Sequence, residues 1–547
     1  MNPTELLQQT DRALAAGEAL TADFIRALAD RVSDNGKPDQ ARLDALQPEA
    51  FRLAQLYAQG TAAREMMQYG QLGELEALLA VGFGGVTLQT QREMLPLLAL
   101  RLDKGGSALR DFSADVEVDQ VIRQSSDDGF NSRLLNLMRE RNSDGADSLG
   151  DEHRMLRDTF RTFAERTVKP HAEKFHREDE LIPDDLIRQV AELGCFGLSI
   201  PQDYGGFQER PDNLGMVVVT EELSRGALIF GSLITRPEIL SKALLKGGTE
   251  AQKQKYLPRL ASGENMVGVA VTEPDYGSDV AGLSVTATPT EGGWRINGTK
   301  TWSTFSGRAE LLALLARTEP DPALGHKGLS MFVVEKPPFY GHDFSHENPD
   351  GGSMHGRAIA TLGYRGMHSY ELSFQDYFVP AENLIGGEAG RGKGFYLQME
   401  GFAGGRMQTA GRALGVMQSA FELAREYAEN RKVFGKPLID LTLTREKLAR
   451  MAIVVQGCRQ AAYAAARLMD DGKGIVEASM VKFMACRQAE WLTREAQQLH
   501  GGMGYAEEFA VSRLFVDARV LSIFEGAEEV LALRVIMPSL VREAAAL

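Results

Sequence analysis

"LLALLARTEPDPALGHKGLSMFVVEK", residues 311–336, holds two short apolar runs on either side of a polar segment with proline and glycine. Short apolar runs bounded by turn residues are typical of β-strands. Runs of the same kind recur from about Met266 to Pro380, including VGVAVTEP (267–274), LSVTATPT (283–290), GWRING (293–298) and YELSFQDYFVP (370–380). The sequence therefore predicts a β-domain in the middle of the chain.

Helical spacing dominates on both sides of this region. Apolar residues recur at helical intervals from Pro3 to about Arg123, for example in FRLAQLYAQGTAAREMM, and a polar stretch with the character of a linker follows. Helical patterns return at about Asp151 and again at about Gly390. We expect a mainly α protein with a central β-domain, divided into an N-terminal helical extension with linker (1–145), a helical domain (146–264), the β-domain (265–385) and a C-terminal helical bundle (386–547).

Composition limits the classes of partner. A chain of 547 residues is too long for one hydrophobic core, and its 60 basic against 75 acidic side chains give a net charge of −15. This balance disfavours nucleic acid or an anionic membrane as the main partner. The three cysteines form no CxxC pair and are predicted to be buried free thiols in a reducing compartment. No targeting segment or membrane span is apparent, so we expect a cytoplasmic protein.

Several familiar catalytic motifs are missing from the sequence. There is no GxGxxG after a strand, no GxxxxGK[ST] and no GxSxG, which disfavours a dinucleotide fold, a P-loop and acyl-enzyme chemistry. His342 and His346 are four residues apart in YGHDFSHENPDGG, but no HExxH accompanies them. The sequence therefore favours a solvated loop over a zinc site there, and predicts no metal.

The segment SIFEGAEEV (522–530) places the carboxylate of Glu525 directly after Ile523 and Phe524 and before a glycine. A carboxylate that loses water against apolar groups becomes a stronger base, as removal of a weakly acidic proton requires. The alternative is an ordinary acidic residue at a helix start, favoured by the helix dipole. Two glycine-containing loops, TEPDYGSD (272–279) and QLHGGMGY (498–505), would let the backbone approach a ligand closely, although each alone also fits a structural turn.

Six segments together resemble, in order and spacing, the flavin-dependent acyl-CoA dehydrogenase family. They are VTEPDYGSDVAG, NGTKTWSTFSG, FQDYFVPAENLIG, NRKVFGKP, QLHGGMGYAEE and IFEGAEEV, and the resemblance covers about Asp151 to Leu540. It implies a helical domain, a β-barrel-like domain and a C-terminal four-helix bundle. It also implies FAD bound between the subunits of a homodimer, an acyl-CoA substrate and an electron-transfer flavoprotein as acceptor.

The resemblance assigns roles to individual residues. Glu525 matches the catalytic base, and its backbone N–H would polarise the thioester carbonyl. Ser278 matches a contact to the CoA thioester arm, and Arg406 matches an arginine of the substrate site. Seven residues match FAD contacts, with Thr272 at the pyrimidine edge, Trp302 and Thr304 beside the isoalloxazine, and Arg431, Phe434, Gln498 and Gly502 reaching across from the neighbouring subunit.

Two positions depart from patterns found in the family. Some branches carry the base on a helix, one residue before the arginine matched by Arg406, but Gly405 occupies that position here. Glu525 is therefore the base that the resemblance implies. The family also usually has Thr-x-Gln after the Glu-Gly pair, where this chain has Ala527 and Glu529. One or two FAD contacts must therefore be made differently, and we assign neither residue to the cofactor.

The N-terminal extension and segments such as LGYRGMHSYELSFQDYFVPAENLIGG resemble family members that oxidise (2S)-methylsuccinyl-CoA to mesaconyl-CoA. Such a substrate brings a second carboxylate into a dry pocket, which requires a cation or strong donors. Arg236, in GSLITRPEIL, has the planar fork that suits a carboxylate; alternatively it pairs with Glu238 or another acid, or faces solvent. Three other functions stay open: another short or branched acyl-CoA dehydrogenase, an acyl-CoA oxidase, and a DNA-binding member of the same fold.

Overall fold

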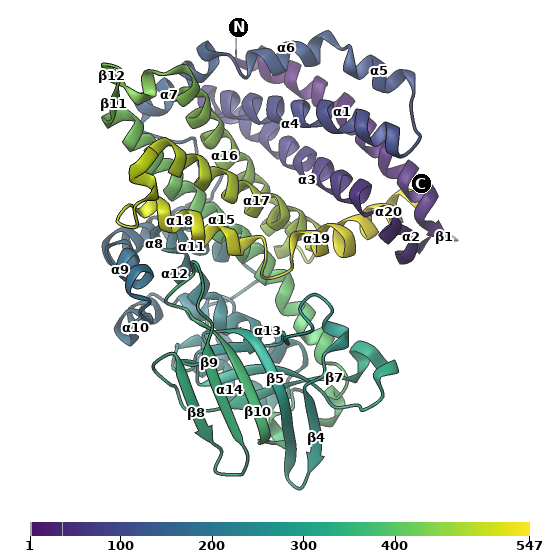
Figure 1. The fold of residues 1–547 in the computed structure, drawn as a ribbon, viewed down its shortest axis with the longest axis vertical. Coiled ribbons are helices and arrows are strands. Elements are labelled where there is room, and N and C mark those ends of the chain that lie inside the picture. The colour runs from purple at the N-terminus through teal and green to yellow at the C-terminus, as the bar shows by residue number, and fades with distance from the viewer. Residues whose placement is uncertain (1–2, 35–36, 547) are drawn as a thin grey trace. The chain divides into compact units, whose positions relative to one another are not determined.

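The computed structural model describes residues 3–34 and 37–546, apart from the side chain at position 400 (Figure 1). It divides into two compact units, here called unit 1 (residues 1–158 and 409–547) and unit 2 (residues 159–408). The divisions fall within two helices, α8 (Asp151–Phe163) and α15 (Gly394–Asn430). The four-domain boundaries expected from the sequence stay a prediction.

Unit 1 is helical. The long N-terminal helices α1, α3 and α4 lie side by side; α3 also packs against α16 and α17, and α4 packs against α16 (Figure 1, purple to blue and green to yellow). Two short hairpins, β1 (Ser33–Asp34) with β2 (Lys37–Pro38) and β11 (Lys432–Val433) with β12 (Lys436–Pro437), complete the strands described in this unit. Besides parts of α8 and α15, its helices are α1 (Pro3–Val32), α2 (Gln40–Ala45), α3 (Gln47–Tyr69), α4 (Glu74–Arg101), α5 (Ser107–Ser113), α6 (Val116–Gln124), α7 (Asp128–Arg141), α16 (Thr442–Asp470), α17 (Ile475–His500), α18 (Ala510–Leu521), α19 (Glu528–Val530) and α20 (Met537–Ala545).

Helices α4 and α16 approach closely because each has a glycine opposite a large side chain of the other. A Cβ on Gly82 would lie 2.4 Å from Cδ1 of Ile453, and a Cβ on Gly457 would lie 2.1 Å from Cε2 of Phe83. Neither distance is sterically possible without movement of the neighbour. The N-terminal extension is thus fitted to the C-terminal helices.

The polar segment after α7 is bonded to these helices. Asp144 accepts hydrogen bonds from Gln418 Nε2 and Arg425 Nη1, both at 2.7 Å. Its backbone oxygen accepts one from Gln456 Nε2 at 2.8 Å, and Ser148 Oγ donates to Gln460 Oε1 at 2.8 Å. The linker-like composition therefore belongs to an ordered strap along α15 and α16.

Unit 2 begins with helices and continues with the sheet. Its α14 starts with a capping box, in which Thr249 and Gln252 each accept a hydrogen bond from the other's backbone N–H. Besides parts of α8 and α15, the helices of unit 2 are α9 (Lys169–Glu178), α10 (Asp184–Glu192), α11 (Asn213–Gly226), α12 (Leu228–Leu233), α13 (Thr235–Gly247) and α14 (Glu250–Ala261). Its strands are β3 (Val267–Ala270), β4 (Thr286–Thr290), β5 (Gly293–Thr304), β6 (Leu311–Arg317), β7 (Leu329–Glu335), β8 (Asp343–Glu347), β9 (Ser353–Ala358) and β10 (Ser369–Pro380).

The strands form one curled sheet in the order β3-β6-β4-β5-β10-β9-β8, with β7 also paired to β6. Strand β6 explains the uninterrupted apolar run that opens the quoted sequence. Leu311, Ala313 and Leu315 pack toward α13 and α14, whereas Leu312 and Leu314 pack into a second core on the opposite face. Because both faces of the strand are buried, its sequence shows no alternation of apolar and polar residues.

The mainly α class with a central β-domain is confirmed, with 65% of the chain in helices. The three cysteines are buried and free, as predicted. Among the described residues, no helix combines the length and apolar character needed to cross a membrane.

Candidate active site

The segment around Glu525 forms a tight turn in unit 1 between α18 and α19. The N–H groups of Ile523 and Phe524 both donate to the carbonyl of Val520, at 2.9 and 3.1 Å. Glu525 itself has φ +55° and Gly526 has φ +98°. A left-handed backbone is uncommon for glutamate and costs about 1–2 kcal/mol, so the surrounding structure must impose it. Such imposed strain commonly marks a functional position.

Two buried cations hold this turn in place. Lys482 of α17 is fully buried and its Nζ donates to the carbonyl of Gly526 at 2.7 Å. The guanidinium of Arg412 on α15, also fully buried, lies 4.8 Å from the ring centre of Phe524. Glu525, between these two anchored residues, is half-buried. Sequence reasoning missed both cations, although a lysine inside the apolar run ASMVKFMAC was a signal.

The expected flavin-ring residues gather at the end of β5 in unit 2. Trp302 has φ +55° and leaves 55% of its surface exposed. Thr304 Oγ1 lies 2.9 Å from Ser369 Oγ on β10. The N–H of Thr301 donates to the carbonyl of Thr272 at 2.8 Å, which brings the VTEP loop beside the same strand. Thr272, Trp302 and Thr304 therefore share one strand end, where an exposed indole and two hydroxyl side chains could meet a flat ligand.

A buried ion pair underlies this loop. Lys300 Nζ lies 2.8 Å from Glu273 Oε1, and both side chains are almost fully buried. The carboxylate also accepts hydrogen bonds from the N–H and Oγ of Ser284 at 2.7 and 2.6 Å. Burial acts to raise the pKa of Glu273, but Lys300 and Ser284 outweigh it and hold that pKa below its usual value. Burial lowers the pKa of Lys300 to about 8, opposed by Glu273. This pair was not identified from the sequence.

Arg236 is buried on α13, with 4% of its surface exposed. Its Nη2 donates to Thr235 Oγ1 at 3.2 Å, and its Nε donates to the carbonyl of Ser232 at 3.3 Å. Glu238, which the sequence offered as a partner, forms its ion pair with Lys242 instead. The burial of Arg236 excludes exposure to solvent, and the Glu238–Lys242 pair excludes Glu238 as its partner; pairing with another acid stays an alternative to a substrate role.

The two remaining substrate residues lie elsewhere in unit 2. Arg406 is half-buried on α15, whereas Ser278 is exposed beyond the turn that follows Glu273. Helix α15 passes close to α13, since a Cβ on Gly401 would lie 3.4 Å from Cγ2 of Ile239. Arg406 and Arg236 are thus carried by helices that pack against each other.

The residues expected to reach a neighbouring FAD are exposed on unit 1. The ring of Tyr427, near the end of α15, stacks on His500 at the end of α17 with centroids 4.2 Å apart. This contact joins the segments that carry all four residues, and a Cβ on Gly502 would meet no atom within 4 Å. Phe434 has φ +50° and is 95% exposed. The exposed members of this group are Arg431, Phe434, Gln498 and Gly502.

Three family models match consecutive parts of the chain. The acyl-CoA dehydrogenase N-terminal domain matches residues 150–264, the middle domain residues 268–377, and the C-terminal domain residues 392–540. The chain belongs to the acyl-CoA dehydrogenase family. It is accordingly an oxidoreductase that acts on a CH–CH bond. Members of this family use FAD, so FAD is the cofactor, as the resemblance implied.

Individual relatives agree with this assignment. The (2S)-methylsuccinyl-CoA dehydrogenase of Cereibacter sphaeroides is 40% identical, over 96% of this chain and 97% of that protein. The butyryl-CoA dehydrogenase structure from Megasphaera elsdenii superposes with a TM-score of 0.65 at 30% identity, and covers 72% of this chain and 98% of its own. A glutaryl-CoA dehydrogenase from Mycobacterium smegmatis, solved in complex with FADH2, has a TM-score of 0.62 at 26% identity and covers 71% and 94%.

Proposed function

We propose that this acyl-CoA dehydrogenase oxidises (2S)-methylsuccinyl-CoA to mesaconyl-CoA. The N-terminal extension carries the proposal. The relative named for methylsuccinyl-CoA is matched over 96% of this chain, so the likeness includes the extension. The butyryl-CoA and glutaryl-CoA dehydrogenase structures cover only 72% and 71% of it. The alternative is a dehydrogenase of another short or branched acyl-CoA.

In the proposed reaction Glu525 removes the α-proton of the thioester. Because its neighbours Phe524 and Gly526 are held in place, the carboxylate of Glu525 can be positioned at the α-proton with little reorganisation. The backbone N–H of Glu525 donates to the thioester carbonyl oxygen and stabilises the negative charge that develops there. Bound FAD would supply the acceptor for the hydride that leaves the β-carbon. Loss of the α-proton and the β-hydride leaves the double bond of the enoyl-CoA.

We assign the flavin contacts to the end of β5 and to a second copy of the chain. The hydroxyl of Thr272 would bond the pyrimidine edge, and Trp302 and Thr304 would hold the ring system. The exposed group on unit 1 suits a role in a partner's site, because it includes Phe434 and Arg431, and aromatic and arginine side chains are enriched where protein subunits meet. In each dimer, the cofactor of one copy would receive Arg431, Phe434, Gln498 and Gly502 of the other.

We assign the second carboxylate of the substrate to Arg236. A buried guanidinium offers several donors in one plane, and bidentate contact with a carboxylate is the strongest use of them. Two of its hydrogen bonds, at 3.2 and 3.3 Å, go to the Thr235 hydroxyl and the Ser232 carbonyl of the α12–α13 segment and hold the guanidinium in a defined orientation. Ser278 and Arg406 complete the proposed contacts to the thioester.

The remaining partners follow from the same proposal. The minimal active unit is a homodimer, and an electron-transfer flavoprotein takes the electrons from reduced FAD. A cytoplasmic location stays a prediction. Nucleic acid is not a proposed partner, since the chain carries a net charge of −15.

A dye-reduction assay with a panel of acyl-CoA thioesters tests the substrate. The panel includes (2S)-methylsuccinyl-CoA, its neutral isostere 2-methylbutyryl-CoA, butyryl-CoA and glutaryl-CoA. We expect the highest kcat/KM with methylsuccinyl-CoA; a preference for a neutral thioester would reject the substrate while leaving the family chemistry intact. Peroxide production under air would identify an oxidase, and a gel shift at physiological salt would identify a DNA-binding protein.

A further inference from the structure

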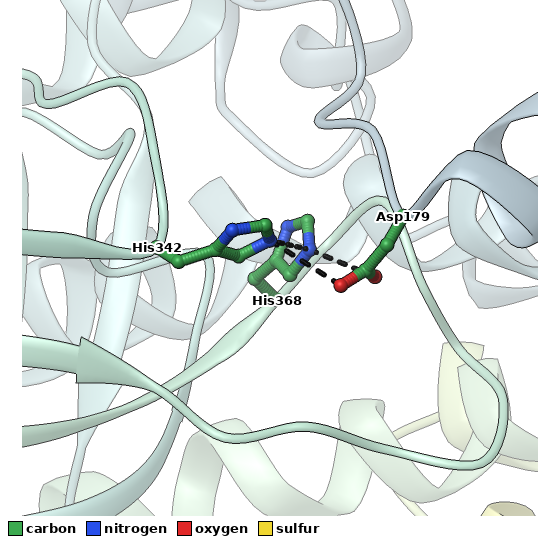
Figure 2. A group of neighbouring side chains, drawn as sticks. All are labelled: Asp179, His342 and His368. Atoms are coloured by element: carbon green, nitrogen blue, oxygen red, sulfur yellow. Dashed lines mark hydrogen bonds and ion pairs between the residues drawn. The ribbon is translucent and has the colours of Figure 1, made fainter.

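Three potential metal ligands, none of them assigned a role above, meet in unit 2 (Figure 2). Asp179 follows the last residue of α9, His342 precedes β8, and His368 precedes β10. Each offers one ligand atom, and these atoms all lie within 4.8 Å of one another. Figure 2 shows that the imidazole rings of His342 and His368 both point toward the carboxylate of Asp179.

The separations match the edges of a small coordination polyhedron. His368 Nε2 lies 3.0 Å from Asp179 Oδ1 and 3.1 Å from His342 Nε2, and His342 Nε2 lies 3.3 Å from Asp179 Oδ2. Zinc binds nitrogen and oxygen at about 2.0–2.1 Å in tetrahedral geometry, which places neighbouring ligand atoms about 3.3 Å apart. Because the two histidines lie nearest to different oxygens of Asp179, one ion between the three groups could bind both nitrogens and either one or both carboxylate oxygens.

Hydrogen bonding alone does not satisfy all three contacts. Each Nε2 carries either one proton or one lone pair in its ring plane. If both nitrogens are protonated and donate to Asp179, two N–H groups face each other at 3.1 Å. If His342 accepts from His368, its lone pair faces the carboxylate at 3.3 Å. A cation between them would replace these unfavourable contacts with three favourable ones, from the two imidazole nitrogens and the carboxylate to the ion.

The surroundings suit a bound ion that is open on one side. The side chain of His368 is buried, whereas that of His342 is 54% exposed, so solvent can supply the remaining ligand. Asp179 and His368 both have left-handed backbones, with φ of +53° and +40°. The first is the C-cap of α9, and these backbone conformations present both ligand atoms to the same point.

We propose that Asp179, His342 and His368 bind one divalent cation of the zinc class. Two imidazoles and one carboxylate favour zinc, cobalt, nickel or copper over magnesium and calcium, which prefer oxygen ligands. The ion ties the end of α9 to the starts of β8 and β10. Ser369, next to His368, contacts Thr304 at the end of β5, so the ion also steadies that edge of the sheet.

Cobalt titration of purified, tag-free holoenzyme tests the proposal, because Co²⁺ in a nitrogen–oxygen site absorbs visible light. After subtraction of the flavin spectrum, we expect one Co²⁺ per chain, displaced by Zn²⁺ but not by Mg²⁺. His342→Gln, at an exposed position, should weaken binding at least about tenfold. His355→Gln is the matched control, since His355 is an exposed histidine of β9 whose described contact is to Ser345; it should bind like the wild type.

Two results of the cobalt titration would overturn the proposal. One is absence of a stoichiometric cobalt signal in the wild type; the other is equal binding by all three proteins, which would indicate surface histidines. Thermal unfolding supplies an independent reading. Zinc should raise the midpoint of the wild type and of His355→Gln, and EDTA should reverse the shift. Unchanged FAD content and circular dichroism establish that His342→Gln is folded, and a zinc shift retained by this variant would also reject the site.

Discussion

At Glu525 the backbone takes the left-handed conformation that glycine normally adopts, and Gly526 continues it. The sequence identified this carboxylate from its apolar neighbours and from the family motif. It did not identify Lys482 or Arg412, which anchor the turn from α17 and α15. Nor did it bring His342 together with Asp179 and His368, because the nearest of these is 26 residues away along the chain. Contacts between distant segments leave no periodic signal in the sequence.

Arg236→Leu tests the proposed carboxylate contact. Loss of the guanidinium should lower kcat/KM for methylsuccinyl-CoA by a factor equivalent to about 2–4 kcal/mol, because the second carboxylate of the substrate would then be buried without a partner. Activity on 2-methylbutyryl-CoA, which has no second carboxylate, should be unchanged or higher. Arg236→Lys keeps the charge without the planar fork, so its kcat/KM for methylsuccinyl-CoA should lie between those of the wild type and Arg236→Leu. Equal losses on both substrates would mean that Arg236 has a structural role.

Glu273→Gln tests the buried pair beneath the VTEP loop. Removing the counterion should destabilise the protein by about 3–5 kcal/mol, since Lys300 is then buried alone. Without Glu273 the pKa of Lys300 falls further below that of the unfolded chain, so the unfolded state binds more protons and stability rises with pH. The difference between wild type and variant in the free energy of unfolding, measured with urea, should therefore be larger at about pH 6 than at about pH 9. A difference that does not depend on pH would reject this account of the pair.

Among the elements, β6 and β7 were predicted correctly, because short apolar runs with turn residues on both sides leave few alternatives. The long helices before residue 123 were also predicted, but not what they pack against. The glycines that decide this contact, Gly82 on α4 and Gly457 on α16, carry no signal of their own. The segment around Asp144 had the composition of a linker, yet its side chains bind α15 and α16.

Gly457→Val tests how the N-terminal extension is held. The new side chain would collide with Phe83, so we expect the free energy of unfolding, measured with urea, to fall by about 1–3 kcal/mol. Gly60→Ala on α3 is the control, because its Cβ would meet its nearest atom at 3.8 Å. It should be neutral or stabilising by up to about 1 kcal/mol. Similar losses in both variants would contradict the close approach of α4 and α16.

For the whole molecule, the proposed sharing of the FAD site between two chains predicts a homodimer. In the extension, α3 packs against α16 and α17 and α4 packs against α16, and we expect it to occupy surface that could otherwise pair two dimers. Light scattering of the holoenzyme should therefore give a mass near twice the 59.9 kDa of one chain. A single tetrameric species would contradict the idea that the extension blocks further assembly, and an active monomer would contradict the shared site.

The most direct test of the central claim is reduction of the bound flavin by methylsuccinyl-CoA in a single turnover, measured without oxygen for the wild type and for Glu525→Gln. The wild type should bleach and form one mesaconyl-CoA per flavin. The variant keeps the shape of the side chain but cannot accept the proton, so its flavin should bleach about 100- to 10,000-fold more slowly while FAD content and ligand binding are retained. A variant that keeps more than about a tenth of the wild-type rate would show that Glu525 is not the base.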